Sequence, residues 1–311
     1  MSGRTQAERV LHVLTGCTAV GKTEWALGWA ESHDAEILSC DSLLFYRGMD
    51  IGTAKPSASE LSRVRHHLID IREVSEPMNA AVYASLARSA AEDIVGRGRK
   101  VLVVGGSGFY LRTFFAPVAD GVDVPREVRE EVSRRLEAGG LGALVAELLR
   151  LNPAGLGALD TANPRRVSNA LGRCLASGKT LAELALDFAR AERPFVGWEV
   201  RLVRLDRDPA DLDARIHARV EAMLRAGLVD EVSRLLAHGL RSNPSACRAI
   251  GYRETLEVLE GKEPPGGLAL AIAKNTRALV KKQRTWFRTQ LPQHQRVDAS
   301  ALLEPERLFL G

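Results

Sequence analysis

Eight residues near the start of the chain have the composition and spacing of a phosphate-binding loop. They match G-x-x-x-x-G-K-[ST] without a gap and follow a short apolar run, Leu11–Thr15: Gly16, Cys17, Thr18, Ala19, Val20, Gly21, Lys22 and Thr23. Glycines let such a loop turn successive backbone N–H groups toward one anion, and the helix that follows adds partial positive charge. Lys22 offers a full positive charge to a terminal phosphate, and the Thr23 hydroxyl suits Mg²⁺. The sequence therefore predicts a site for the diphosphate of a small-molecule substrate.

Polar side chains also follow two later apolar runs. Asp41 and Ser42 come directly after Glu36–Cys40, and Ser107 lies in the Gly-rich segment after Val101–Val104. Functional groups gather at the carboxyl ends of parallel strands, so we expect Asp41 and Ser107 at the rim that holds the phosphate loop. An aspartate there can orient a nucleophile and accept its proton, or it can cap a helix or support a metal. The residues alone favour neither role.

The Gly-rich segment Gly105–Gly108 carries no carboxylate. Kinases and ATPases with a phosphate loop usually hold their metal with an acid at the end of such a strand, so its absence weakens the case for phosphoryl transfer. Tyr46–Pro56 mixes glycine, charge and proline without a period, which predicts a long functional loop. The adjacent His66 and His67 would point opposite ways on a strand, so we expect structural or polar roles for them and no shared metal.

Strands that alternate with helices predict an α/β fold with a parallel sheet. Residues 117–197 instead read as successive helices, so we expect a core of residues 1–116 and 198–311, with C-terminal helices, and a helical insert at 117–197. A separate tandem domain is the alternative. Beyond the runs given above, the expected strands are His66–Ile71 and Glu199–Leu205, and the expected helices are Lys22–Ser32, Ala80–Val95, Arg126–Glu137, Leu141–Leu151, Arg165–Ser177, one capped by Thr180, Pro209–His238 and Gly267–Gln290.

Composition limits the location and the partners of the protein. Hydrophobic residues make up 45% of the chain, which supports a buried core, and no apolar run approaches the roughly 18 residues of a membrane helix. The polar first ten residues contain no signal-peptide stretch, so we expect a cytosolic protein that does not contact membranes. The four cysteines form no Cys-x-x-Cys pair and are expected to be reduced. The net charge of +4 suits a polyanionic partner, and it suits ordinary solubility equally well.

Basic residues recur in the last expected helix at steps of three and four, which places them on one face. No acid interrupts the segment, and a stripe of one sign repels itself unless a polyanion neutralises it. We therefore expect this stripe to contact the phosphates of a polyanion, with a solvated face as the alternative. Its members are Lys274, Arg277, Lys281, Arg284 and Arg288.

Together these blocks resemble those of tRNA dimethylallyltransferases of the bacterial type, over about residues 11–290. The long middle blocks are more specific than the phosphate loop alone. The blocks that carry the resemblance are the phosphate loop, Asp41-Ser42, Tyr46–Pro56, His66–Asp70, Ser75–Pro77, Gly105–Leu111, Arg248–Arg253 and Lys281–Arg288.

The resemblance implies transfer of a dimethylallyl group from dimethylallyl diphosphate to N6 of adenosine 37 in the tRNA anticodon loop. It implies a P-loop NTPase-like core related to nucleoside kinases, a helical insert and Mg²⁺ as cofactor. We also expect the protein to act as a monomer. Lys22 and the phosphate loop would hold the diphosphate, Asp41 would act as base on the adenine amine, and Ser107 would lie near both. The tRNA-contacting residues implied are Asp41, Ser42, Leu43, Leu44, Ser107, Arg129, Arg165, Arg166, Val167, Ser168, Asn169, Arg248, Ala249, Ile250, Gly251, Tyr252, Arg253, Lys281, Lys282, Gln283, Arg284, Thr285, Trp286, Phe287 and Arg288.

The chain departs from the family pattern at a few positions. Cys17 and Val20 replace the commoner Pro and Ser, and Ser107 replaces Thr but keeps the hydroxyl. Leu44 stands where Gln is frequent, which puts a base contact there in doubt. Three alternatives remain: a small-molecule kinase, a prenyltransferase of free adenine nucleotides, and a non-catalytic RNA-binding protein with a phosphate loop.

Overall fold

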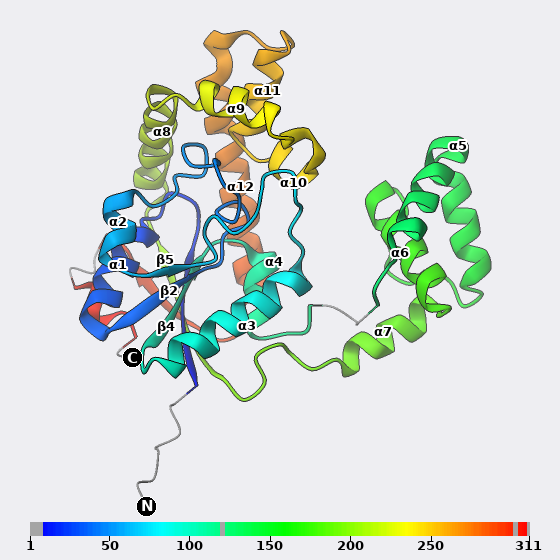
Figure 1. Ribbon diagram of the computed structural model, residues 1–311, viewed down its shortest axis with the longest axis horizontal. Helices are drawn as coiled ribbons and strands as arrows, with labels where there is room; N and C mark the ends of the chain where they lie inside the picture. Colours follow the sequence, from blue (N-terminus) through cyan, green and yellow to red (C-terminus); the bar gives the residue numbers. More distant parts are fainter. Residues whose placement is uncertain (1–8, 119–121, 301–303, 310–311) are drawn as a thin grey trace, which may run out of the picture. The chain divides into compact units, whose positions relative to one another are not determined.

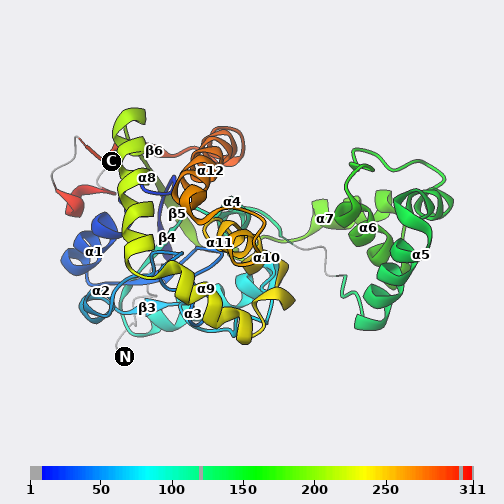
Figure 2. The same cartoon turned by 90° about the horizontal axis from the view of Figure 1, so that it is seen from above.

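The computed structural model describes residues 9–118, 122–300 and 304–309 (Figures 1 and 2). Within these residues, six strands form one sheet in the order β3-β2-β4-β1-β5-β6, and every neighbouring pair is parallel. This confirms the predicted α/β class. The strands are β1 Val10–Gly16, β2 Ala35–Ser39, β3 His66–His67, β4 Lys100–Gly105, β5 Glu199–Asp206 and β6 Gln295–Asp298.

The helices alternate with the strands in the first part of the chain and follow one another later. The α-helices are α1 Lys22–His33, α2 Ala58–Arg63, α3 Ala80–Gly96, α4 Gly108–Leu111, α5 Arg126–Leu151, α6 Pro164–Ser177, α7 Leu181–Arg190, α8 Pro209–Arg225, α9 Leu228–Ala237, α10 Pro244–Cys247, α11 Tyr252–Leu259 and α12 Leu268–Gln290. None of the described helices is both long enough and apolar enough to cross a membrane.

Helices cover the central strands on both faces. The β1–β2 and β3–β4 crossovers run in opposite directions along the sheet, so right-handed connections place α1 and α3 on opposite faces. Helix α1 contacts β1, β2 and β4, and α3 contacts β2 and β4. Strands covered on both sides favour apolar residues on both faces, which is why β1 and β4 are rich in Val and Leu.

Three expectations for the elements of this core were wrong in part. The third strand ends after His67, because Leu68 and Asp70 have left-handed φ angles of 61° and 54° that leave the extended conformation. The long helix expected at 209–238 is two helices, since Gly227 begins α9 with φ 94°. The edge strand β6 was not predicted, because its four residues contain a single hydrophobic one, Val297.

The chain divides into two compact units, residues 1–115 with 194–311, and residues 116–193. The second unit is helical throughout its described residues, and α5 is broken at Gly140, which has φ 70° and ψ −178°. Pro164 begins α6 after the Asn163 cap, and Thr180 caps α7. This unit has a hydrophobic core of its own, built on Val132, Leu144, Leu148, Val167, Ala170, Leu171, Cys174 and Leu184.

Candidate active site

The phosphate loop forms the turn between β1 and α1, at the carboxyl edge of the sheet. Ala19 has φ 67° and the α1 cap Gly21 has φ 102°, so the backbone curls tightly before the helix begins. The first N–H groups of α1 have no acceptor within the helix and are suited to an anion. The Lys22 ammonium arches over its own loop and donates to the carbonyl oxygens of Gly16 and Cys17, at 2.9 Å each.

Three charged groups at this site influence one another. Loss of hydration lowers the pKa of Lys22 to about 8, the Asp41 carboxylate acts to raise this pKa, and the Arg219 guanidinium lowers it further. Loss of hydration also lowers the pKa of Arg219, again against the effect of Asp41. Two cations and one carboxylate therefore share a poorly hydrated pocket, and the excess positive charge favours an anionic ligand.

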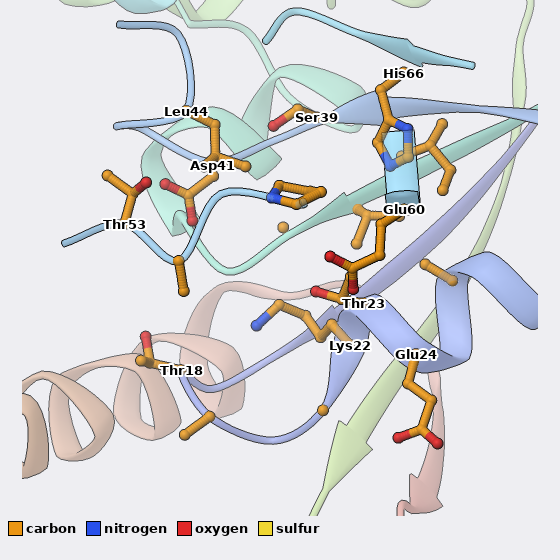
Figure 3. Close-up of a pocket in the computed structure, with 18 of the residues that line it drawn as sticks. Thr18, Lys22, Thr23, Glu24, Ser39, Asp41, Leu44, Thr53, Glu60 and His66 are labelled. Carbon is orange, nitrogen blue, oxygen red and sulfur yellow. The ribbon is translucent and has the colours of Figure 1, made fainter. Parts of the chain in front are cut away.

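A cavity of about 590 Å³ opens beside the loop (Figure 3). Lys22 and Thr23 lie on one side of it, and the Asp41 carboxylate faces them from the opposite wall. One oxygen of Asp41 accepts a hydrogen bond from Leu43 N at 3.0 Å, which fixes the carboxylate. The other oxygen makes no hydrogen bond with the described residues, so Asp41 can accept a proton or a hydrogen bond from a ligand.

A second cavity, of about 730 Å³, adjoins the first. Thr18, Asp41, Thr53 and Arg219 line both. Beyond these shared residues, the second cavity combines cationic and aromatic side chains, which suits phosphates and stacked bases of a single-stranded nucleic acid. Its lining includes Ser107, Phe109, Arg112, Arg248, Arg253, Lys282 and Trp286.

Ser107 and Phe109 occupy the start of the short helix α4, after β4. Ser107 is the α4 cap residue, yet its hydroxyl makes no capping hydrogen bond. The Phe109 side chain is 62% exposed, which is unusual for a residue of this size beside a cavity. Both side chains thus border the second cavity in positions where a ligand can contact them.

Arg215 and Arg219 are site residues that the sequence-based predictions did not include. They lie four apart on α8, so they share a face, and both line the first cavity. Arg215 Nε donates to Ala19 O at 2.9 Å, and Arg219 Nη2 donates to Thr53 O at 3.0 Å. In the sequence, these arginines are marked only by their spacing of four after a strand of the same sheet. Arginines four apart are common on solvated helices, so this spacing could not identify them as site residues.

Some of the residues implied as tRNA contacts have buried side chains. Val167 is 0% exposed in the core of the helical unit, and Phe287 is 1% exposed. Tyr252 is 0% exposed, and its hydroxyl donates to Glu231 at 2.6 Å. These three side chains pack in hydrophobic cores, Val167 in that of the helical unit and Tyr252 and Phe287 in that of the other unit. The tRNA contact of each stretch therefore stays a prediction for its exposed neighbours.

Gln283 has a structural position between the two loops at the sheet edge. Its amide nitrogen donates to Gly106 O at 3.0 Å, and its amide oxygen accepts from Thr18 N at 3.0 Å. It therefore links the phosphate loop to the segment that carries Ser107. In the helical unit, Arg129, Arg165, Arg166 and Asn169 are exposed, and Ser168 is half-buried.

The basic stripe of α12 does not face the second cavity. Arg277 pairs with Asp213 of α8 at 2.5 Å, and Arg284 donates to Arg207 O at 3.2 Å. At about 100° per residue, the stripe is centred roughly 180° around the helix from the face that lines the cavity. The expectation that a polyanion must neutralise the whole stripe is wrong for Arg277, because Asp213 already does so. The residues of α12 that line the cavity include Asn275, Ala278, Leu279, Lys282, Gln283 and Trp286.

Comparison with known proteins bears on what this site does. Residues 44–290 match the family described as IPP transferase. The tRNA dimethylallyltransferase of Opitutus terrae is 66% identical over 299 residues, which cover 96% of each chain. The chain belongs to the tRNA dimethylallyltransferase family. It is therefore an enzyme of a prenyltransferase family.

Solved structures agree with this assignment. The tRNA isopentenylpyrophosphate transferase of Bacillus halodurans is 31% identical, with a TM-score of 0.66 over 94% of this chain and 90% of that one. A eukaryotic dimethylallyltransferase acting on tRNA is 24% identical, with a TM-score of 0.79 over 94% of this chain and 74% of that one, which shows a shared fold. The P-loop core and its sheet are thus those of the tRNA dimethylallyltransferase family.

Proposed function

We propose that this chain transfers a dimethylallyl group from dimethylallyl diphosphate to N6 of adenosine 37 in the anticodon loop of tRNA. The meeting of the two cavities at Asp41 carries the proposal. One cavity offers cations and helical N–H groups to a diphosphate, and the other offers cations and aromatic rings to an RNA loop. A donor and an acceptor that enter from these two cavities meet beside the one carboxylate that lines both.

The diphosphate end consists of the phosphate loop, Lys22, Arg215 and Arg219. When the C1–O bond of the donor breaks, its electron pair stays on the diphosphate oxygen, and negative charge builds there. Groups that are already oriented and poorly hydrated stabilise such charge more than water does. Lys22, with its depressed pKa, and Arg219 meet this description.

Mg²⁺ fits the oxygen donors of the first cavity. Thr23 is exposed at the start of α1, and Asp41 and Glu60 line the same cavity. The described residues contain no group of three or more His, Cys, Asp and Glu side chains able to hold a metal alone. Mg²⁺ commonly takes one or two protein ligands together with substrate phosphates, so Thr23 would hold it against the diphosphate. Bound there, the ion would add charge stabilisation to the leaving group.

Asp41 serves the acceptor. The adenine N6 amine forms the new C–N bond and gives up one proton, which the unoccupied oxygen of Asp41 accepts. Ser107 borders the same space and donates or accepts one hydrogen bond to the amine or the diphosphate. The adenine must leave its stack to reach this point, and Phe109 and Trp286 line the cavity that we assign to the RNA loop.

The helical unit and the second cavity are assigned to tRNA. In the core unit the phosphate contacts are Arg248, Arg253 and Lys282, and in the helical unit they are Arg129, Arg165 and Arg166. We expect the enzyme to act as a monomer. We expect it to act in the cytoplasm, where it would meet its tRNA substrate.

The test is incubation with an anticodon stem-loop RNA that carries adenosines at positions 36, 37 and 38, together with dimethylallyl diphosphate and Mg²⁺. We expect mass spectrometry to find one dimethylallyl group on adenosine 37. A parallel reaction with ATP in place of the diphosphate is expected to leave the RNA and the nucleotide unchanged. Phosphate transfer from ATP to any acceptor, with no alkylated RNA, would instead support a kinase.

A further inference from the structure

A buried carboxylate on α9 holds the loop at residues 50–53, which borders both cavities. Glu231 is 1% exposed and accepts four hydrogen bonds. One of its oxygens accepts from Asp50 N at 3.0 Å and from Ile51 N at 2.7 Å. The other accepts from Gly52 N at 3.1 Å and from the Tyr252 hydroxyl at 2.6 Å.

This arrangement resembles an anion-binding turn that the protein fills with its own side chain. Three successive N–H groups converge on one carboxylate, and within the described residues no lysine or arginine pairs with Glu231. A buried carboxylate without a cation is costly unless hydrogen bonds satisfy it, and here each oxygen accepts two. Loss of hydration and the nearby Glu231 raise the pKa of Tyr252, which keeps its hydroxyl a donor.

The close approach of Tyr252 explains the glycine in the loop. A Cβ added at Gly52 would lie 2.5 Å from the Tyr252 ring, well inside contact distance. The ring and the carboxylate of Glu231 therefore fix the backbone of residues 50–52 from both sides. The loop is held by long-range contacts with α9 and α11.

The fixed turn delivers a carbonyl to the active site. Thr53 directly follows the clamped residues, and its carbonyl oxygen accepts a hydrogen bond from Arg219 Nη2 at 3.0 Å. Thr53 and Arg219 both line the two cavities, whereas Glu231 lines neither. A shift of the 50–52 backbone would therefore move the acceptor that orients Arg219.

We propose that Glu231 is a positioning residue for the donor diphosphate, acting through the turn at residues 50–53 and the Thr53–Arg219 hydrogen bond. This rests on the proposed function, in which Arg219 contacts the diphosphate. Glu231 lines neither cavity, so its removal is expected to act through the turn and to weaken diphosphate binding. Thr53 and Arg219 also line the second cavity, so tRNA binding is expected to weaken by a smaller factor, because most of the residues assigned to tRNA lie elsewhere.

Glu231→Gln tests the proposal with little change in size. In the variant, an amide nitrogen replaces one carboxylate oxygen and faces two hydrogen-bond donors. The Tyr252 hydroxyl can rotate to accept a hydrogen bond from the amide. A backbone N–H group cannot, so at least one hydrogen bond is lost. Calorimetry with inorganic pyrophosphate and Mg²⁺ is expected to give a Kd roughly 5- to 20-fold weaker than wild type, since hydrogen bonds to charged groups are among the stronger ones. The KM for dimethylallyl diphosphate should rise by a similar factor, and the Kd for tRNA should rise by a smaller factor.

The matched control is Glu36→Gln. Glu36 is also a buried, multiply bonded carboxylate of the same unit, but its partners are Arg97 and His67, away from the loop. It should lower the melting temperature without changing the pyrophosphate Kd. A general loss of stability would thus change the pyrophosphate Kd of both variants. A positioning effect would change the Kd of Glu231→Gln alone. If Glu231→Gln does not fold, Tyr252→Phe takes its place, with a roughly two- to tenfold weaker Kd expected from one lost hydrogen bond.

A double-mutant cycle identifies the route. If Glu231 acts through Arg219, Glu231→Gln should have no further effect on the pyrophosphate Kd in an Arg219→Ala background. An unchanged Kd in the folded single variant, or an equal loss in both backgrounds, would overturn the proposal. Wild-type enzyme that binds pyrophosphate but does not alkylate the RNA would count against the proposed function and leave this proposal standing.

Discussion

Lys281 and Lys282 are neighbours in sequence, are both exposed, and lie on different faces of α12. Lys282 lines the second cavity, whereas Lys281 lies on the stripe with Arg277 and Arg284, whose guanidinium groups contact Asp213 and the Arg207 carbonyl. The two single alanine variants remove the same charge from the same helix. If the RNA loop enters the second cavity, only Lys282→Ala should remove a phosphate contact.

The expected size of the effect follows from counterion release. One lost phosphate contact lowers the slope of log affinity against log salt by about 0.7–0.9. Between about 50 and 200 mM salt, wild type should then lose roughly threefold more affinity than Lys282→Ala does. At about 0.1 M salt the variant should bind tRNA roughly five- to eightfold more weakly. Lys281→Ala should keep the wild-type slope, and neither variant should change the affinity for dimethylallyl diphosphate.

Filter binding or fluorescence anisotropy with a labelled anticodon stem-loop, at four or more salt concentrations, measures these slopes. Arg277→Ala is a useful third variant. Arg277 pairs with Asp213, so its removal should leave the slope of log tRNA affinity against log salt unchanged. Equal changes in slope for Lys281→Ala and Lys282→Ala would show that RNA follows the stripe as well as the cavity. A change in Lys281→Ala alone would refute the assignment of the RNA path to the second cavity.

The remaining predictions concern the chemistry and the RNA contact. Lys22→Ala should lower kcat by roughly 10²–10³ in a folded protein. In wild type, kcat/KM for dimethylallyl diphosphate should fall as the pH rises through about 8, because the free enzyme loses the Lys22 proton there; a profile that stays flat to pH 9.5 would contradict this. Asp41→Asn should slow single-turnover alkylation by roughly 10²–10⁴ while tRNA still binds, and a wild-type rate would rule out the base assignment. Ser107→Ala should slow alkylation less than Asp41→Asn does, and Ser107→Thr should keep a rate close to wild type. Phe109→Ala should weaken stem-loop binding by roughly 5- to 100-fold and Phe109→Trp should restore it, since the contact is a stacked base; equal affinities for wild type and Phe109→Ala would place that base elsewhere.

Features that depend on neighbours along the chain could be predicted from the sequence. The phosphate loop is one example, because glycine positions, a preceding apolar strand and a following helix are all local. Helix starts such as Pro164 and Thr180 are others, since a cap bonds to residues two or three positions away. The approach of Asp41 and Ser107 to the phosphate loop followed from one general rule, that the carboxyl ends of parallel strands share an edge.

Features that depend on which surfaces meet were decided only by the tertiary structure. The period of α12 correctly grouped its basic residues on one face, but the direction of that face depends on Asp213, 64 positions away. The hydrogen bonds that Glu231 accepts from the N–H groups of residues 50–52 join positions about 180 apart in the chain. Nothing in the local sequence distinguishes Arg219 from other surface arginines until α8 packs beside the phosphate loop. Periodicity fixes which residues lie together on an element, and only packing fixes what that element faces.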